Sequence, residues 1–211
     1  SLPREDVRDA FISPNLGSIA ELASGAVVGT SSLRRRAQLL NRRPDLNVVE
    51  FRGNVQTRLE KLDNGVAECT FLAAAGLKRL GRDDVPATPV DPEDMLPAVA
   101  QGAIGIERHA DDARMQEMLA AIHDTPTGQR LAAERAFLQA LDGSCETPIA
   151  GLATLDGDEL HLRGEVLRPD GSQSLSGERR GPMKTGAAMG VELAKELLER
   201  AGEGFFDWHT H

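Results

Sequence analysis

Short apolar segments alternate with helical patterns between residues 27 and 80, and this alternation restricts the possible folds more than any other feature of the sequence. Apolar runs at 26–30, 46–51 and 69–75 each have the length of a buried strand. The segments between them carry apolar residues at spacings of three and four, which is typical of helices that pack on one face. A β-α-β-α-β order of this kind predicts a parallel sheet with right-handed crossovers.

Capping residues mark where the helices of this unit begin and end. Ser31 or Ser32 can cap the first helix and Asn54 can cap the second, because short polar side chains accept hydrogen bonds from the unpaired amides of a first turn. Pro44 ends the first helix. A short helix is expected near 77–80, after the third strand.

The pattern is weaker between this unit and residue 123. Four prolines between 86 and 97 indicate a linker or a domain edge. Residues 99–107 are strand-like and rich in glycine, and a helix is expected over 111–122.

From residue 125 onward the sequence predicts a second, antiparallel part. Thr125 as N-cap and Pro126 at the first helical position open a helix to about Leu141. Three segments then alternate apolar and polar residues with a period of two, which predicts antiparallel hairpins. A last helix near 185–200 should cover one face of their sheet. The three hairpin segments are 149–155, 160–167 and 173–179.

The chain is acidic, yet it contains one arginine-rich segment. It has 24 Lys and Arg against 33 Asp and Glu, whereas residues 27–82 hold eleven basic and five acidic residues. The net charge of −9 and the low aromatic content of 3% argue against nucleic acid and against an anionic membrane surface as partners. A local arginine cluster in such a chain indicates a specific small polyanion.

Arginines follow the carboxyl ends of all three predicted parallel strands, where ligands bind in open α/β sheets. Guanidinium groups bind carboxylates bidentately and stay protonated, so the pattern predicts a site for several carboxylates, with phosphate as the competing anion. Small and hydroxyl residues precede these arginines and leave helix N-termini accessible. The arginines expected to converge on one crevice are Arg34, Arg35, Arg52, Arg58 and Arg79.

A solvated helix face is the alternative interpretation of these arginines. Consecutive residues point about 100° apart on a helix, so Arg34, Arg35 and Arg36 cannot all face one ligand. We expect Arg36, Arg42 and Arg43 to face solvent.

The two cysteines have different sequence environments. Cys69 lies inside an apolar strand and is expected in the core. Cys145 lies in a loop between a helix end and a strand, where a thiol can be accessible for covalent chemistry. Two cysteines, no membrane-length apolar run and no export signal favour a soluble cytoplasmic protein. His209 and His211, at the chain end, are not expected to bind a metal.

Six stretches of the sequence resemble the porphobilinogen deaminase family, also called hydroxymethylbilane synthase. They follow the order of the family and cover nearly the whole chain. The stretches are PREDVRDAF (3–11), VGTSSLRRRAQLL (28–40), FRGNVQTRLEKLD (51–63), LAAAGLKRL (72–80), LPAVAQGAIGIE (96–107) and AERAFLQALDGSCETPIAG (133–151).

This resemblance implies a transferase that joins four porphobilinogen molecules head to tail, releases ammonia each time, and frees hydroxymethylbilane by hydrolysis. In the family, the cysteine of the GSC motif carries a dipyrromethane cofactor through a thioether, and Cys145 matches it. The implied partners are porphobilinogen and the growing polypyrrole chain, in a monomer. The residues implied to bind cofactor and substrate carboxylates are Thr30, Ser31, Ser32, Arg34, Arg35, Arg52, Gly53, Arg58 and Arg79.

The resemblance also implies a fold of two domains like periplasmic binding proteins and a small α+β domain. Residues 1–97 would be the second domain, 98–123 would return to the first, and 124–211 would be the cofactor-attachment domain. Family members begin with a domain that carries the catalytic aspartate, and this chain starts after it. We therefore expect a fragment that is inactive alone, with an exposed apolar surface around 98–120. A noncatalytic polycarboxylate-binding module is the alternative function.

Overall fold

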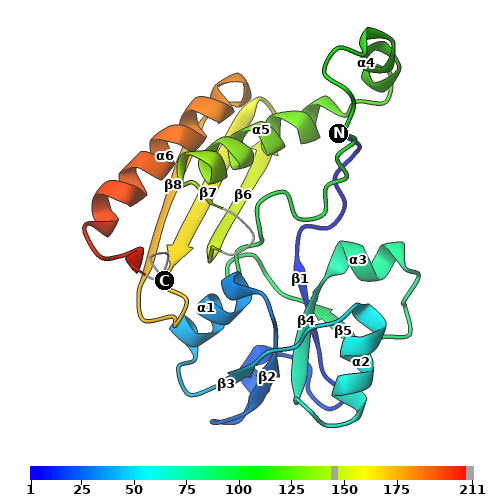
Figure 1. The fold of residues 1–211 in the computed structure, drawn as a ribbon, viewed down its shortest axis with the longest axis vertical. Coiled ribbons are helices and arrows are strands. Elements are labelled where there is room, and N and C mark those ends of the chain that lie inside the picture. Colours follow the sequence, from blue (N-terminus) through cyan, green and yellow to red (C-terminus); the bar gives the residue numbers. More distant parts are fainter. Residues whose placement is uncertain (144–146, 208–211) are drawn as a thin grey trace.

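The computed structural model describes residues 1–143 and 147–207 of the protein. Its ribbon shows two layered parts, a mixed sheet with helices and an antiparallel sheet under two helices, connected by two neighbouring segments of chain (Figure 1). The expected α/β class, with a sheet that contains parallel strands and a separate antiparallel sheet, is confirmed.

The predicted β-α-β-α-β unit forms the centre of the larger sheet. Its elements are β2 (Val27–Gly29), α1 (Leu33–Arg42), β3 (Asn47–Val49), α2 (Val55–Asp63), β4 (Cys69–Ala73) and α3 (Ala74–Arg79). Strand β2 is parallel to both β3 and β4. Apolar residues on the two faces of the sheet form separate clusters, one with α1 and the other with α2 and α3. The sheet is therefore covered on both faces, as expected for parallel strands.

Two short strands that the sequence pattern does not predict complete this sheet, β1 (Asp9–Ile12) and β5 (Ala87–Pro89). Strand β1 pairs antiparallel with β4 and β5, which gives the order β3-β2-β4-β1-β5. Four buried residues are too few to show an alternating pattern. Strand β5 lies in the proline-rich segment interpreted as a linker, and Pro89 is tolerated there because β5 is an edge strand.

The segment 99–107 forms no strand, so that prediction is wrong. Ala100 and Gly102 have φ angles of 62° and 81°, which turn the chain out of the extended conformation. The segment lies instead beside the beginning of the chain, where the amide of Glu5 donates to the Gly102 carbonyl at 3.1 Å.

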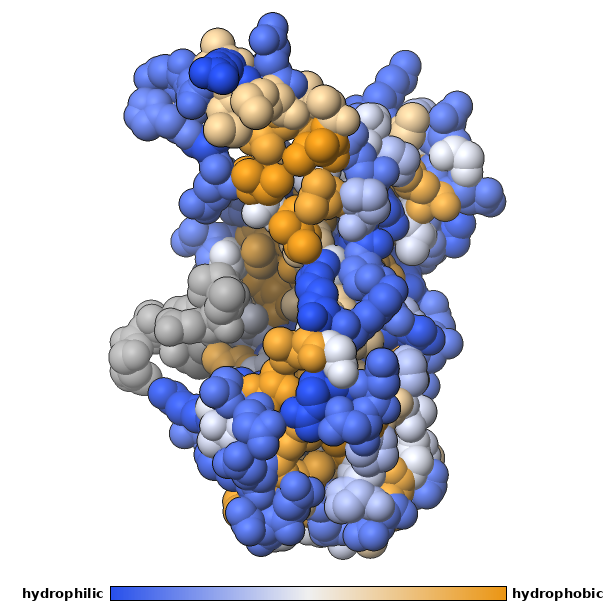
Figure 2. All heavy atoms as spheres, turned by 90° about the vertical axis from the view of Figure 1, so that its right-hand side faces the viewer, coloured by the Kyte–Doolittle hydropathy of each residue, from blue (hydrophilic) through white to orange (hydrophobic). Residues whose placement is uncertain are grey.

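Helix α4 (Ala113–Ala120) confirms the helix predicted over 111–122 and stands apart from both sheets (Figure 1). Its apolar side chains are exposed: Met118 by 57% and, just beyond the helix, Ile122 by 50%. The side of the molecule that lies on the right in Figure 1 carries apolar surface in its upper half (Figure 2). The predicted apolar surface around residues 98–120 is present, since Ile104, Ile106 and Met115 are also exposed.

The C-terminal part confirms the three hairpin strands and both helices. Helix α5 begins one residue earlier than predicted, because Asp124 and not Thr125 is the N-cap and accepts the hydrogen bond from the Thr127 amide, at 2.9 Å. Strand order is β6-β7-β8, and α5 and α6 cover one face. The elements are α5 (Thr125–Ala140), β6 (Ile149–Asp156), β7 (Glu159–Leu167), β8 (Ser174–Pro182) and α6 (Gly186–Ala201), with short 3-10 helices at η1 (Ile19–Glu21) and η2 (Met183–Thr185).

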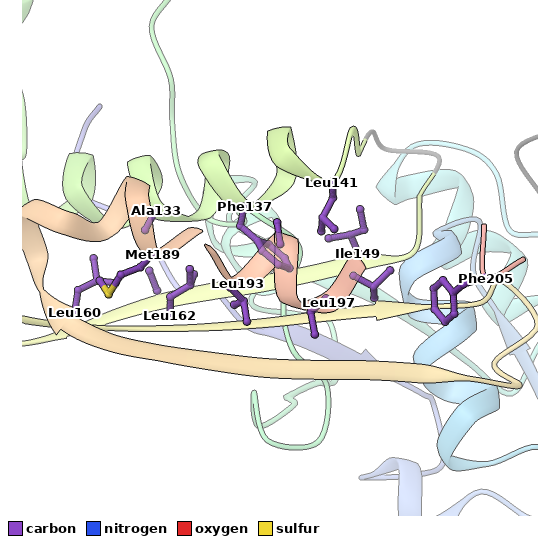
Figure 3. Packing of buried hydrophobic residues seen from close by; sticks show 13 residues of the cluster. Ala133, Phe137, Leu141, Ile149, Leu160, Leu162, Met189, Leu193, Leu197 and Phe205 are labelled. Atoms are coloured by element: carbon purple, nitrogen blue, oxygen red, sulfur yellow. The ribbon is translucent and has the colours of Figure 1, made fainter. Parts of the chain in front are cut away.

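Phe137 of α5 lies in the centre of this C-terminal core, with its ring toward the sheet (Figure 3). Its ring presses against β7 where residue 164 is glycine, because a Cβ there would lie 2.4 Å from the ring Cζ. Leu160 and Leu162 of β7 and Leu193 of α6 belong to the same cluster and are fully buried. The helices are therefore held tightly on one face of the sheet.

The two parts are joined by residues 1–8 and 96–103, which lie side by side. Besides the Glu5 contact, the side-chain amide of Gln101 donates to the Val7 carbonyl at 2.7 Å. The chain thus crosses between the two parts twice, and the crossings are bonded to each other.

A buried ion pair fixes this joint to α5. Arg4 pairs with Glu134 at 2.5 Å, and neither side chain is more than 1% exposed. Glu134 also accepts hydrogen bonds from the amides of Ala100 and Ala153, at 2.7 and 2.8 Å. Both oxygens of the Glu134 carboxylate therefore accept hydrogen bonds.

Within residues 1–143 and 147–207, no helix has both the length and the apolar character that crossing a membrane requires.

Candidate functional site

Three hydroxyl side chains organise the loop between β2 and α1. Ser32 caps α1 by accepting from the Arg35 amide, and Thr30, which is buried, accepts from the Ser32 amide at 3.2 Å. Ser31 is exposed and accepts from the amide of Phe51 at 3.0 Å, which ties the loop to the end of β3. The carboxyl ends of β2 and β3 are thereby held together.

A fully buried carboxylate, Asp9 of β1, lies beneath this loop and holds two arginines of α1. Arg34 donates to it from Nη1 at 2.8 Å and from Nη2 at 3.2 Å. Arg35 donates from Nη2 at 2.7 Å and from Nε at 3.0 Å. Burial by itself raises the pKa of Asp9, but the charges of Arg35 and Arg34 outweigh burial and hold that pKa below its ordinary value. Two guanidinium groups therefore bind the buried carboxylate of Asp9.

The inner arginine of this pair is bonded only within the protein. Arg34 is 5% exposed, and its Nη1 also donates to the Leu96 carbonyl and to Gln38 Oε1, each at 3.0 Å. Arg35 is 8% exposed and donates to the Phe71 carbonyl. Asp9 therefore engages both arginines, and their binding of cofactor or substrate carboxylates stays a prediction.

Arg58 of α2 is the arginine that differs from these two. It is half-buried, and its Nε donates to the carbonyl of Gly53, which has a φ of +132°. Burial and the nearby charge of Arg35 lower its pKa. No carboxylate of the described residues lies within ion-pair distance of Arg58. A cation in a positive environment without an acidic partner fits an acidic ligand.

The two remaining arginines of the predicted set occupy different positions. Arg79 donates to the Gly102 carbonyl at 2.9 Å, and the neighbouring Gln101 donates to Asp9, so Arg79 reaches the same joint segment as the buried pair. Arg52 points into solvent: its side chain is 80% exposed and pairs with Glu50. The predicted convergence of all five arginines is wrong for Arg52.

The arginines assigned to solvent are also more engaged than expected. Arg36 donates to the Val48 carbonyl, Arg42 donates to Gln38 and Glu165, and Arg43 pairs with Asp45 at 2.7 Å. Each guanidinium group therefore bonds to the protein, because a long side chain at the edge of a sheet layer can reach carbonyls of the neighbouring loop.

Of the two cysteines, only Cys69 falls within the described residues. It is fully buried, which confirms the prediction of a core residue, and burial raises the pKa of its thiol to about 12. Cys69 is therefore unreactive. Cys145, the predicted point of covalent attachment, lies outside the described residues, as do His209 and His211.

Sequence reasoning gave no role to the acceptor and amide groups that organise this site. Asp9 lies in the PREDVRDAF stretch, and Gln38 and Gln101 lie in two other matched stretches, so their only sequence signal is membership of those stretches. All three surround Arg34, although they are distant in sequence.

A cavity of about 490 Å³ lies elsewhere, between α1, η1 and the segment that follows β5. Its lining is largely apolar and includes Phe11, Leu39 and Met95, with Arg42 and Asp94 among its polar residues. None of the predicted site residues lines it.

Fold and site together define a two-part α/β protein with a cationic site at the carboxyl ends of parallel strands. Two family models identify that protein class further. The model described as "Porphobilinogen deaminase, dipyromethane cofactor binding domain" matches residues 1–117, and "Porphobilinogen deaminase, C-terminal domain" matches residues 129–199. The chain belongs to the porphobilinogen deaminase family, and its first matched domain is described as one that binds a dipyrromethane cofactor.

Curated relatives are similar over nearly the whole chain. The chain is 66% identical over 207 residues to the porphobilinogen deaminase of Paracoccus denitrificans. The matched residues make up 98% of this chain and 66% of the relative. It is 53% identical over 205 residues to the porphobilinogen deaminase of Nitrobacter hamburgensis, covering 97% and 65%. The chain therefore spans about two thirds of the length of these relatives.

These matches bear on the expectation that an N-terminal domain is missing. The match to the cofactor-binding domain begins at residue 1, and the two matches extend to residue 199. The expectation of an absent domain, and with it of an absent catalytic aspartate, is therefore not confirmed by the family models.

Proposed function

We propose that this chain binds the dipyrromethane cofactor and the pyrrole carboxylates of a hydroxymethylbilane synthase reaction, in which four porphobilinogen molecules are joined head to tail. The observation that carries the proposal is Arg58, which is half-buried beside Arg35 without an acidic partner among the described residues. Each pyrrole of such a chain carries carboxylates, and a guanidinium group in this environment gains a charge-assisted partner when one binds.

The residues divide by exposure into ligand-binding and supporting roles. Arg58, with the exposed Ser31 and Gly53 beside it, would contact ligand carboxylates, and the N-termini of α1 and α2 add amide donors and positive dipole ends. Arg35, which is buried, would contribute its positive charge without contacting the ligand. Thr30 and Ser32 shape the loop, and Arg34 holds Asp9 in place.

Outer contacts would come from Arg52 and Arg79, which are exposed and reach the ligand only as the pyrrole chain lengthens. Cys145 would hold the cofactor through a thioether. When bound, dipyrromethane would supply the terminal pyrrole to which the first porphobilinogen ring is joined with loss of ammonia. This chain's own side chains bind and orient carboxylates.

No described residue of this site is assigned as the catalytic acid. Asp9 accepts hydrogen bonds from Arg34, Arg35 and Gln101 and is fully buried, so it has no access to a substrate proton. The proposed division is 1–97 as a periplasmic-binding-protein-like domain, 98–123 as a segment belonging to another such domain, and 124–211 as the attachment domain.

The proposed partners are porphobilinogen and the growing polypyrrole chain, bound by a cytoplasmic monomer. Nucleic acid is disfavoured as a partner by the net charge of −9 and the scarcity of aromatic residues.

Binding of porphobilinogen to the purified chain tests the carboxylate site. We expect Arg58→Gln to weaken binding about tenfold, the effect of losing one charged hydrogen bond. Arg114→Gln is the matched control, because Arg114 is exposed on α4, away from the site. Equal affinity of the Arg58 variant and the control would contradict the proposed site.

Intact-mass spectrometry after incubation with porphobilinogen tests the covalent role. We expect a mass increase on the chain that Cys145→Ala abolishes. A chain that binds porphobilinogen without any mass increase would instead be the noncatalytic polycarboxylate-binding module.

A further inference from the structure

Gln38 of α1 is completely buried between the two parts of the molecule, and its amide group is bonded on both sides. Its Oε1 accepts from Arg34 Nη1 at 3.0 Å, so it contacts the arginine that holds Asp9. Its Nε2 donates to Glu165 Oε2 on β7 at 2.7 Å and to the Leu96 carbonyl at 3.0 Å. One side chain thus contacts the cationic site, the joint and the C-terminal part.

Glu165 is well placed to hold this amide. It is 5% exposed, and its other oxygen accepts from Ser174 Oγ at 2.9 Å and faces Arg42 at 3.5 Å. Since Ser174 lies on β8, the carboxylate is fixed within the C-terminal sheet. A row of polar contacts therefore runs from Asp9 through Arg34 and Gln38 to Glu165.

We propose that Gln38 is a positioning residue that couples the arginine site to the docking of the C-terminal part. Where the ligand concerned is a pyrrole carboxylate, this inference rests on the proposed function. When Glu165 is docked, Gln38 is held with its oxygen toward Arg34, and Arg34 is held on Asp9. When docking loosens, Gln38 can rotate and Arg34 loses one of the acceptors that orient it.

An amide is the group that this position requires. The side chain must accept a hydrogen bond from Arg34 and donate hydrogen bonds to Glu165 and Leu96. An amide does both, because its oxygen accepts and its NH2 group donates. A carboxylate at position 38 would face the Glu165 carboxylate across a buried contact, and like charges in such a place repel strongly. Exchanging the groups, with glutamate at 38 and glutamine at 165, restores one donor and one acceptor.

A second contact docks the same two parts without contacting Arg34. Asn41, one helical turn after Gln38, donates from Nδ2 to the Gly171 carbonyl at 2.9 Å. Gly171 lies in the β7–β8 turn with a φ of +74°, and a Cβ there would lie 2.5 Å from the backbone nitrogen of Asn41. Asn41→Ala therefore weakens docking alone and serves as the matched control.

Two measurements test the coupling on the full chain: affinity for porphobilinogen, and hydrogen exchange of two reporter amides. The Gly171 amide reports on the docked turn, and the Val90 amide, which donates to the Asp9 carbonyl, reports on the site. We expect Gln38→Glu to weaken porphobilinogen binding about tenfold, within the usual range of coupling between sites, and to speed exchange at both amides. The double variant Gln38→Glu, Glu165→Gln should return both readouts to within about threefold of the original protein.

The control separates coupling from docking. Asn41→Ala should speed exchange at Gly171 and leave both the Val90 amide and the affinity unchanged. A double variant that stays as impaired as Gln38→Glu, or an Asn41→Ala variant that loses affinity equally, would overturn the proposal. If Gln38→Glu does not fold, a folded double variant with native exchange supports the coupling, and an unfolded double variant overturns it.

The exchange readout keeps the two proposals distinguishable. If the original chain does not bind porphobilinogen, the proposed function fails. The coupling would still stand if exchange at Val90 rises in Gln38→Glu and recovers in the double variant, and it would fall if Val90 does not respond.

Discussion

Two carboxylates of this protein, Asp9 and Glu134, are equally buried and differ in their charge balance. Glu134 pairs with one arginine, Arg4, and two backbone amides complete its hydrogen bonds. Asp9 pairs with two arginines, Arg34 and Arg35, which leaves one positive charge in excess next to Arg58. The balanced pair sits at the joint between the two parts, and the unbalanced group sits at the strand ends. The two buried carboxylates thus differ in whether their arginines leave a positive charge without a counter-charge.

Breaking the balanced pair should have the largest effect. Glu134→Ala leaves Arg4 buried without a counter-charge and removes an acceptor from two amides, so we expect a loss of about 3–5 kcal/mol in the free energy of unfolding. Urea denaturation measures it. Asp84→Ala is the control, because the Arg82–Asp84 pair is at the surface and its loss should cost less than about 1 kcal/mol. Equal effects in the two variants would show that burial does not matter here.

Asp9→Asn should destabilise the protein by about 2–3 kcal/mol. It leaves two arginines without a charged partner, but the amide oxygen still accepts a hydrogen bond. The variant should also lose affinity for porphobilinogen, because the arginines are no longer held in place. Unfolding and binding are both measured on the same preparation, and a variant with native affinity would mean that Asp9 does not position the site.

Acid should weaken the Asp9 group in a predictable direction. The pKa of Asp9 is lowered in the folded protein, so its contribution is present above the unfolded value of about 3.9 and is lost as the pH falls through the lower folded pKa. Unfolding measured between neutral pH and about pH 3 should therefore show a smaller acid dependence in Asp9→Asn than in the original chain. An identical pH profile in both would contradict the lowered pKa.

The smallest expected effect on stability belongs to Arg58. Arg58→Gln removes a charge that has no acidic partner among the described residues and that Arg35 opposes, so the free energy of unfolding should change by less than about 0.5 kcal/mol. Thermal unfolding checks this. A large destabilisation would place Arg58 with the structural arginines rather than with the ligand-binding ones.

The sequence predicted the regular elements with strong periodicity. The three parallel strands, the three hairpin strands and the helices that flank them all have patterns that match their packing, because each buries one face. Periodicity does not predict strands β1 and β5, because β1 has only four residues and β5 ends in proline. The glycines at 102 and 105 belong to a turning segment, which residue composition does not distinguish from a strand.

The site was predictable in its arginines and not in their partners. Arg34 and Arg58 follow strand ends that the sequence marks, whereas Asp9 lies 25 residues before Arg34 and on a strand without a recognisable pattern. Gln38 is polar on the buried face of α1, where a hydropathy pattern expects an apolar residue. Polar groups that are buried because they bond to one another have no periodic signal.

The paired crossing between the two parts sets the kind of motion the molecule allows. A single covalent link would let one part swivel freely about the chain axis. Here residues 1–8 and 96–103 are bonded to each other by the Glu5 amide and the Gln101 side chain, so twisting one part would have to break these bonds. Bending across the pair breaks none of them. Such bending would have to break the contacts of Gln38 with Glu165 and of Asn41 with Gly171, so these side chains hold the two parts together while the paired segments limit twisting.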